Sequence, residues 1–203
     1  MDQTRPTGRI SVPKPTSSQT IGPFFAYCLT SSEYGYTLVA DNSLKSPSGK
    51  KIKISGKVYD GEQNPVPDAM LEIWQADPEG TFLAPQSEKH QSFMGFARVG
   101  TGEDGSFLFN TVKPGSLKPI GGLPQAPHIN LHVFARGLID HLTTRIYFSD
   151  EAHTYKDPLI SLISDDNRKQ TLIAEFQEEQ AGCAIYTFNI NLQGANETVF
   201  LRW

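Results

Sequence analysis

The chain has 203 residues, 38% of them hydrophobic and 10% aromatic, with a net charge of -4 and a pI near 5.7. This length is sufficient for one sizeable hydrophobic core. The negative net charge gives no reason to expect a nucleic-acid partner. No run of 18 apolar residues is present, and residues 1–15 lack the apolar segment of a secretory signal. Cys28 and Cys183 form no metal or redox motif. We therefore expect a cytoplasmic protein with no membrane partner.

Residues 1–30 are expected to form an N-terminal arm that packs on a partner chain, ahead of a single domain over residues 31–203. The Gly22-Pro23 pair in this arm favours extended backbone and disfavours a helix. Two interpretations of the arm are open. It either anchors the chain, or it places Thr20, Gly22 and Pro23 against a ligand, because glycine allows close approach and threonine offers a hydroxyl.

Alternating apolar and polar residues predict the first strands. Residues 53–59 (KISGKVY) and 70–77 (MLEIWQAD) are expected to form a hairpin around a proline-containing turn. In the second strand Leu71, Ile73 and Gln75 are expected on one face, opposite Glu72, Trp74 and Ala76. Residues 79–99 resemble a loop, residues 106–112 (SFLFNTV) form a third strand, and Lys113 is predicted to be a turn residue.

The segment 128–136 (HINLHVFAR) carries the most unusual pattern. Alternate residues Ile129, Leu131, Val133 and Ala135 are expected to face a core, whereas the opposite face carries His128, Asn130, His132, Phe134 and Arg136. Residues two apart on a strand lie roughly 6.6 Å apart and can share a metal, but His128 and His132 lie about 13 Å apart and cannot. Position 130, between them, is asparagine. The strand therefore has the shape of a metal-binding strand with a donor missing, and isolated histidines that hydrogen-bond locally are the simpler reading.

The remaining elements complete an all-β pattern. After the strand at 128–136, another strand is expected over residues 141–148. A helix is expected over 164–176, capped by Asp165 or Asp166, and further strands over 184–193 and 197–203. Seven or more short strands with regular turns predict a mainly β fold, a β-sandwich with an extended N-terminal arm and one or two short helices. Arg136 can bind a carboxylate in two-point fashion, or form a surface ion pair worth less than about 1 kcal/mol.

Several segments together resemble the intradiol ring-cleaving dioxygenases over residues 16–203. They are SQTIGPF, LEIWQAD, TVKPG, APHIN, FARG, RIYFSDE and ETVF. Catalytic chains of that family hold a ferric ion with two tyrosines and two histidines, and these positions fall here on Phe82, Leu117, His128 and Asn130. Phenylalanine and leucine carry no donor atom, and an amide is a poor replacement for imidazole. The resemblance thus implies the family's fold, with no metal ligand set and no catalytic residue in this chain.

The same resemblance implies a two-chain enzyme. A homologous beta chain would hold the Fe(III), and this chain would line the substrate pocket with Thr20, Gly22, Pro23 and Arg136. The implied substrates are 3,4-dihydroxybenzoate and O2, and the implied assembly is a higher-order oligomer of alpha/beta heterodimers. Two other functions are open: an enzyme that uses a different metal through His128 and His132, and a non-enzymatic β-sandwich interaction module.

Overall fold

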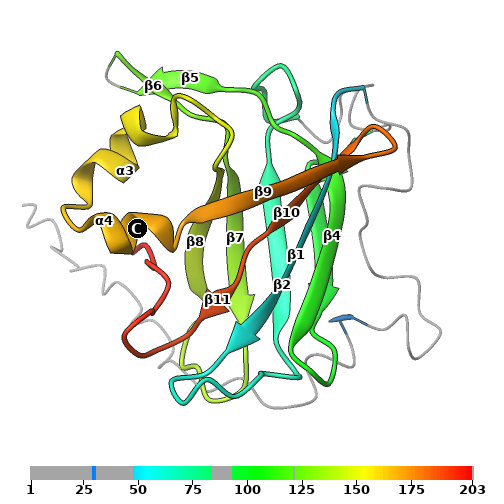
Figure 1. Ribbon diagram of the computed structural model, residues 1–203, viewed down its shortest axis with the longest axis vertical. Helices are drawn as coiled ribbons and strands as arrows, with labels where there is room; N and C mark the ends of the chain where they lie inside the picture. Colours follow the sequence, from blue (N-terminus) through cyan, green and yellow to red (C-terminus); the bar gives the residue numbers. More distant parts are fainter. Residues whose placement is uncertain (1–28, 31–47, 84–92, 121, 203) are drawn as a thin grey trace, which may run out of the picture.

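A computed structural model describes residues 29–30, 48–83, 93–120 and 122–202 (Figure 1). Short strands are the main regular structure in this part of the chain. The strands are β1 (Lys51–Tyr59), β2 (Met70–Gln75), β3 (Phe96–Gly100), β4 (Ser106–Val112), β5 (Leu117–Ile120), β6 (Leu123–Gln125), β7 (Ile129–Phe134), β8 (Leu142–Phe148), β9 (Ile173–Gln180), β10 (Cys183–Thr187) and β11 (Ile190–Asn191). The helices are the 3₁₀ turn η3 (Thr154–Lys156), α3 (Pro158–Leu162) and α4 (Asp166–Gln170). None of these helices is long and apolar enough to cross a membrane.

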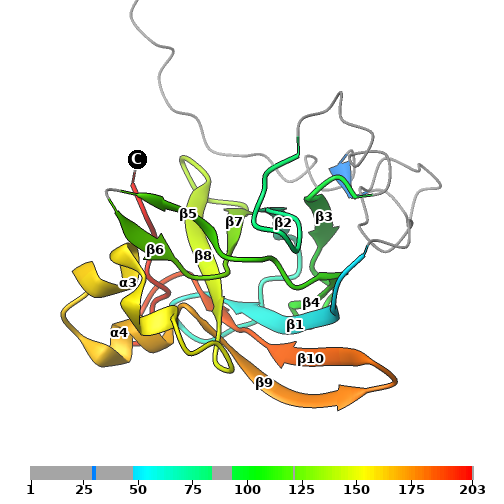
Figure 2. The ribbon, with the colours of Figure 1, turned by 90° about the horizontal axis from the view of Figure 1, so that it is seen from above.

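The strands are arranged in two facing layers. Within the described residues, the main sheet runs in the order β11-β1-β10-β9-β8-β7-β2-β3, and β4 pairs with β1. Seen from above, β1, β4, β9 and β10 lie in one layer, and β2, β3, β7 and β8 lie in the other (Figure 2). The short parallel pairing of β8 with β9 joins the two layers. This arrangement confirms the prediction of a mainly β sandwich, whereas the predicted arm lies almost entirely outside the described residues.

The core lies between the two layers and follows the predicted alternation. Ile129, Leu131, Val133 and Ala135 are all buried, as expected for the inward face of β7. Leu71, Ile73 and Gln75 of β2 are also buried, opposite the half-buried Glu72 and the exposed Trp74. The core residues of β1 that face them across the sandwich are Ile52, Ile54 and Val58. Burial of these alternating faces is what selects strands over helices at these positions.

The predicted hairpin of residues 53–59 and 70–77 is wrong. β1 pairs with β4, β10 and β11, whereas β2 pairs with β3 and β7. The two strands therefore lie in opposite layers, and the turn between them crosses the end of the sandwich. Two amphipathic strands can bury their apolar faces side by side or face to face, and the alternation is the same in both cases.

Three other boundaries differ from the prediction. The helix expected over residues 164–176 ends at Gln170, and β9 follows from Ile173, because this segment completes a ladder with β10. Residues 96–99, expected to be loop, belong to the strand β3 (Phe96–Gly100), which pairs with β2. The last predicted strand is reduced, within residues 197–202, to an isolated bridge between Leu201 and Thr143. In each case hydrogen bonds to a distant strand decide the outcome.

Candidate functional site

The outer face of β7 and β8 carries the polar side chains that the sequence pattern indicated. Antiparallel pairing places Asn130 opposite Arg145 and His132 opposite Thr143. His128 lies two residues before Asn130, and Tyr147 lies two residues after Arg145. Because the strands are antiparallel, both rings lie at the same end of the strand pair, with centroids 5.5 Å apart. The face is not uniformly exposed: Tyr147 belongs to a small second core beneath α3, whereas His132 lies toward the solvent-accessible end.

His128 is buried, with an exposed fraction of 2%. Its Nδ1 lies 2.8 Å from the carbonyl oxygen of Ala126, and because a carbonyl oxygen only accepts, Nδ1 carries the proton. Nε2 therefore holds a lone pair, and the described part of the chain gives it no hydrogen-bond partner. Burial, assisted by the charge of Arg145, lowers the pKa of His128 to about 4. The imidazole is thus neutral at pH 7 and has the protonation state of a metal ligand.

The side-chain oxygen of Asn130 accepts a hydrogen bond from Arg145. Arg145, whose exposed fraction is 9%, donates from Nε to the Oδ1 of Asn130 at 3.2 Å and from a terminal nitrogen to the Tyr147 hydroxyl at 3.3 Å. The Tyr147 hydroxyl donates to Oδ1 of Asp157 at 3.0 Å, and Oδ2 of Asp157 accepts from the backbone N–H of Ala126 at 2.9 Å. Sequence reasoning missed Arg145. The alternation of β8 could have indicated it: Ile146 faces the core, so the neighbouring Arg145 is expected on the same face as Asn130.

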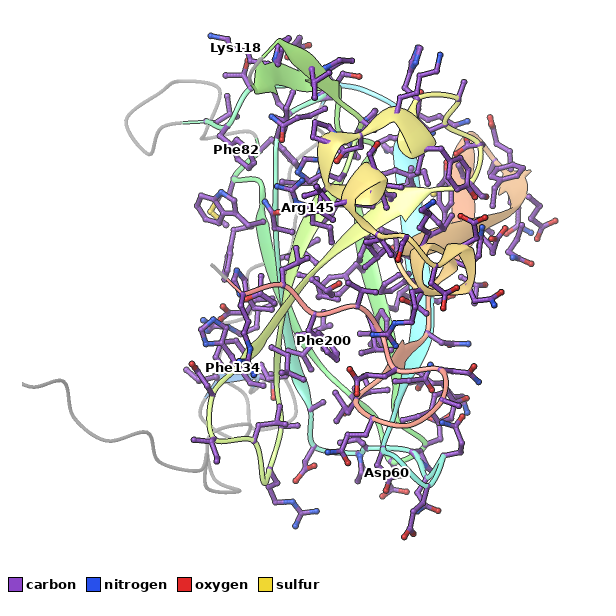
Figure 3. The ribbon with its side chains drawn as sticks, turned by 90° about the vertical axis from the view of Figure 1, so that its left-hand side faces the viewer. Asp60, Phe82, Lys118, Phe134, Arg145 and Phe200 are labelled. Carbon is purple, nitrogen blue, oxygen red and sulfur yellow. The ribbon has the colours of Figure 1, made fainter. Side chains whose placement is uncertain are left out.

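Of the positions assigned to the family's tyrosines, Phe82 lies on a loop and Leu117 is the first residue of β5, and these two segments meet. Gly80 has a φ of +77°, and a Cβ added there would lie 1.9 Å from the carbonyl oxygen of Ser116. Only glycine allows this approach, which brings the loop of Phe82 against the start of β5. In Figure 3, Phe82 and Arg145 lie toward the upper half of the view and Phe134 lies lower. Neither Phe82 nor Leu117 can donate an electron pair to a metal.

These residues do not fit a ferric ion. Three of the four positions carry a benzyl ring, an isobutyl group and an amide whose oxygen already accepts from Arg145. The guanidinium also places a positive charge beside Asn130, the position assigned to the second histidine ligand, and this charge disfavours a metal cation there. Throughout the described ranges, no group of three or more histidine, cysteine, aspartate or glutamate side chains is placed to hold a metal ion. His132 and His141 instead interact locally, His132 with Thr143 and His141 with Asp140.

Arg136 lies far from His128, in the turn that follows β7. The two residues are eight positions apart in the sequence, which corresponds to roughly 26 Å of extended strand. The Arg136 side chain is 58% exposed, and its Nε forms an ion pair with Oδ2 of Asp68. Gly137, with a φ of +82°, turns the chain directly after it. The other candidate pocket residues, Thr20, Gly22 and Pro23, lie outside the described residues, so whether they line a pocket with Arg136 stays a prediction.

Lys113 is more than the turn residue that the sequence suggested. Its side chain is only 14% exposed, and its Nζ lies 2.9 Å from Oδ1 of Asp150 and 3.4 Å from Oε2 of Glu151. The hydroxyl of Tyr186 donates to Oδ2 of Asp150 at 3.0 Å. Lys113 also lies 5.1 Å from the ring centroid of Phe148. This cluster joins the segment TVKPG, which follows β4, to the segment RIYFSDE and to Tyr186 of β10.

Comparison with known proteins agrees with this architecture. The sequence profile of the family described as "Dioxygenase" matches residues 21–194. The chain belongs to the dioxygenase family. It is 42% identical to the protocatechuate 3,4-dioxygenase alpha chain of Burkholderia cepacia, over 92% of this chain and 96% of that one. Identity to the Pseudomonas putida alpha chain is 41%, over 91% and 94% of the two chains.

More distant dioxygenases share the fold at lower identity. The protocatechuate 3,4-dioxygenase beta chain of Burkholderia cepacia is 29% identical, over 79% of this chain and 73% of that one. Among solved structures, the dioxygenase domain of a carbohydrate-binding fusion protein from Streptomyces sp. SirexAA-E superposes with a TM-score of 0.60 at 27% identity. It covers 76% of this chain and 87% of that domain. Identity to the two alpha chains is thus higher than identity to the beta chain.

Proposed function

We propose that this chain is the alpha subunit of a protocatechuate 3,4-dioxygenase and that it binds no iron itself. The observation that carries the proposal is the replacement of three ligand positions, with the Asn130 amide oxygen engaged by the buried Arg145. The similarity to alpha chains over nine-tenths of the sequence supports the same assignment. The enzyme would open the ring of 3,4-dihydroxybenzoate with O2 between its two hydroxylated carbons, giving 3-carboxy-cis,cis-muconate. The Fe(III) would be held by a homologous beta chain.

In this proposal Arg136 binds the substrate carboxylate from across the subunit interface. Arginine carries five N–H donors, and the contact with Asp68 involves Nε, so other donors remain for a ligand. The 58% exposure of the side chain and its distance from His128 both favour a role at a neighbouring chain's site instead of at His128. Thr20, Gly22 and Pro23 would complete the pocket wall, and alpha/beta heterodimers would assemble further into a larger oligomer.

The first test of this function is the metal content of the chain purified alone. We expect less than one-tenth of an equivalent of tightly bound iron and no ring cleavage, because one imidazole cannot hold Fe(III) against hydrolysis. Elemental analysis and oxygen uptake with 3,4-dihydroxybenzoate measure both, and co-expression with a homologous beta chain should restore activity. Stoichiometric iron in the isolated chain would contradict the proposal and favour a self-sufficient metal enzyme.

The second test concerns the substrate carboxylate. In the assembled alpha/beta enzyme, Arg136→Ala should raise KM for 3,4-dihydroxybenzoate roughly ten- to hundredfold, because a charge-assisted hydrogen bond is worth about 1.5–3 kcal/mol. Iron content should not change. Catechol, which lacks the carboxylate, is the matched control and should be turned over equally by both enzymes. Unchanged kinetics with both substrates would remove Arg136 from the pocket and favour the alternative of a non-enzymatic interaction module.

A further inference from the structure

Arg145 is a buried cation beside the strand that carries two of the positions assigned to the family's metal ligands, His128 and Asn130. It lies directly across the β7–β8 ladder from Asn130, the position assigned to the second histidine ligand. A guanidinium remains charged at every accessible pH, so its burial requires hydrogen-bond partners. The side chains of Asn130 and Tyr147 accept hydrogen bonds from the Arg145 guanidinium. The Tyr147 hydroxyl in turn donates a hydrogen bond to Asp157, the N-cap residue of α3. The amide at position 130 is therefore matched to Arg145, because an imidazole there could not offer the same carbonyl acceptor.

His128 keeps the form of a ligand although its partner ligands are gone. Its Nδ1 proton is directed to the Ala126 carbonyl, which leaves the Nε2 lone pair available, and the described residues offer nothing to that lone pair. The backbone that would present a second ligand is also intact, because residues 128 and 130 are two apart and can converge on one ion. The loss of donor atoms is thus one barrier to a cation, and the charge of Arg145 is a second and separate barrier.

We propose that the guanidinium of Arg145 takes the place of the metal ion. It supplies the positive charge at the β7–β8 site, links β7, β8 and α3 through its hydrogen bonds, and keeps the site closed to metal cations. This inference rests on the proposed function, in which the chain carries no iron. It adds that restoring a ligand at position 130 is not sufficient to restore metal binding while Arg145 is present.

The experiment is a titration of the full chain with Co²⁺, followed by visible absorption and by the shift in Tm. Three variants are compared: Asn130→His, Asn130→His with Arg145→Gln, and Asn130→His with Arg145→Lys. We expect the Arg145→Gln double variant to bind Co²⁺ at least tenfold more tightly than Asn130→His alone. The Arg145→Lys double variant should bind as weakly as Asn130→His, because lysine keeps the charge while losing the planar hydrogen-bonding group.

Further variants separate the possible outcomes. Adding His128→Gln to the Arg145→Gln double variant should abolish the gain, which locates the ion at this site. Arg145→Met replaces Arg145→Gln if the glutamine variant does not fold, as judged by circular dichroism. The inference is overturned if Asn130→His alone binds Co²⁺ as tightly as the double variant, or if the folded double variant binds no better than the unmodified chain. Iron in the unmodified chain would instead contradict the proposed function, so the two failures are distinguishable.

Discussion

Lys113→Met is expected to lower the free energy of unfolding by about 1–2 kcal/mol, because it leaves two carboxylates of a partly buried cluster without their cation. Asp150 and Glu151 both lie within 3.4 Å of Lys113 Nζ. Burial acts to raise the pKa of Asp150, but Lys113 and the Tyr186 hydroxyl outweigh it, so the pKa lies below its ordinary value. Without Lys113, the hydrogen bond and the charge that oppose this burial most strongly are lost. Urea denaturation at pH 7, followed by circular dichroism, measures the loss.

The matched control for this prediction is Lys50→Met. Lys50 forms an ion pair with Glu179 at 3.0 Å, but both side chains are about half exposed, so its removal should cost less than about 1 kcal/mol. Adding Asp150→Asn to Lys113→Met should recover part of the loss, since the uncompensated charge is then removed. If Lys113→Met were no more destabilising than Lys50→Met, the cluster would contribute nothing beyond a surface pair.

Acidification is expected to destabilise the fold through His128. The folded state keeps this imidazole neutral down to a pKa of about 4, whereas the unfolded chain takes up a proton near the ordinary value of 6.5. The unfolded state therefore binds more protons between these values, and stability falls as the pH falls. The contribution is fully present above pH 6.5 and is reduced by about 3 kcal/mol at pH 4.

His128→Gln isolates this effect, because glutamine retains a donor for the Ala126 carbonyl and does not titrate. Other groups, including Asp150, also lose stability in acid, so the comparison is between the two proteins and not between two pH values alone. We expect the difference in unfolding free energy between the original chain and His128→Gln to shrink by about 3 kcal/mol from pH 7 to pH 4. Two parallel curves of stability against pH would show that His128 is free to protonate in the folded state.

Local patterns were enough to predict much of the sheet. The alternation in β2, β4 and β7 reports which side chains face the core, because successive residues of a strand point to opposite sides whatever the strand pairs with. The cap at Asp165 is equally local, since its side chain accepts from the N–H of Asn167 only two residues away. The missing metal donors at Phe82 and Leu117 follow from residue identity, because no fold can provide a hydrocarbon side chain with a lone pair.

Pairing and partners could not be obtained in this way. β1 and β2 show the same alternation whether they form a hairpin or lie in opposite layers, so only the assembled sandwich distinguishes the two. Arg145 and Asn130 are 15 residues apart, and Lys113 and Asp150 are 37 apart; each pair meets because of how the strands are placed in the sandwich. Residue types along the chain thus predicted that β7 is amphipathic and that positions 82 and 117 carry hydrocarbon side chains without a donor atom. Only the tertiary structure showed that the buried Arg145 contacts Asn130 near His128. Such a contact between distant residues depends on the pairing of β7 with β8, which neither segment determines alone.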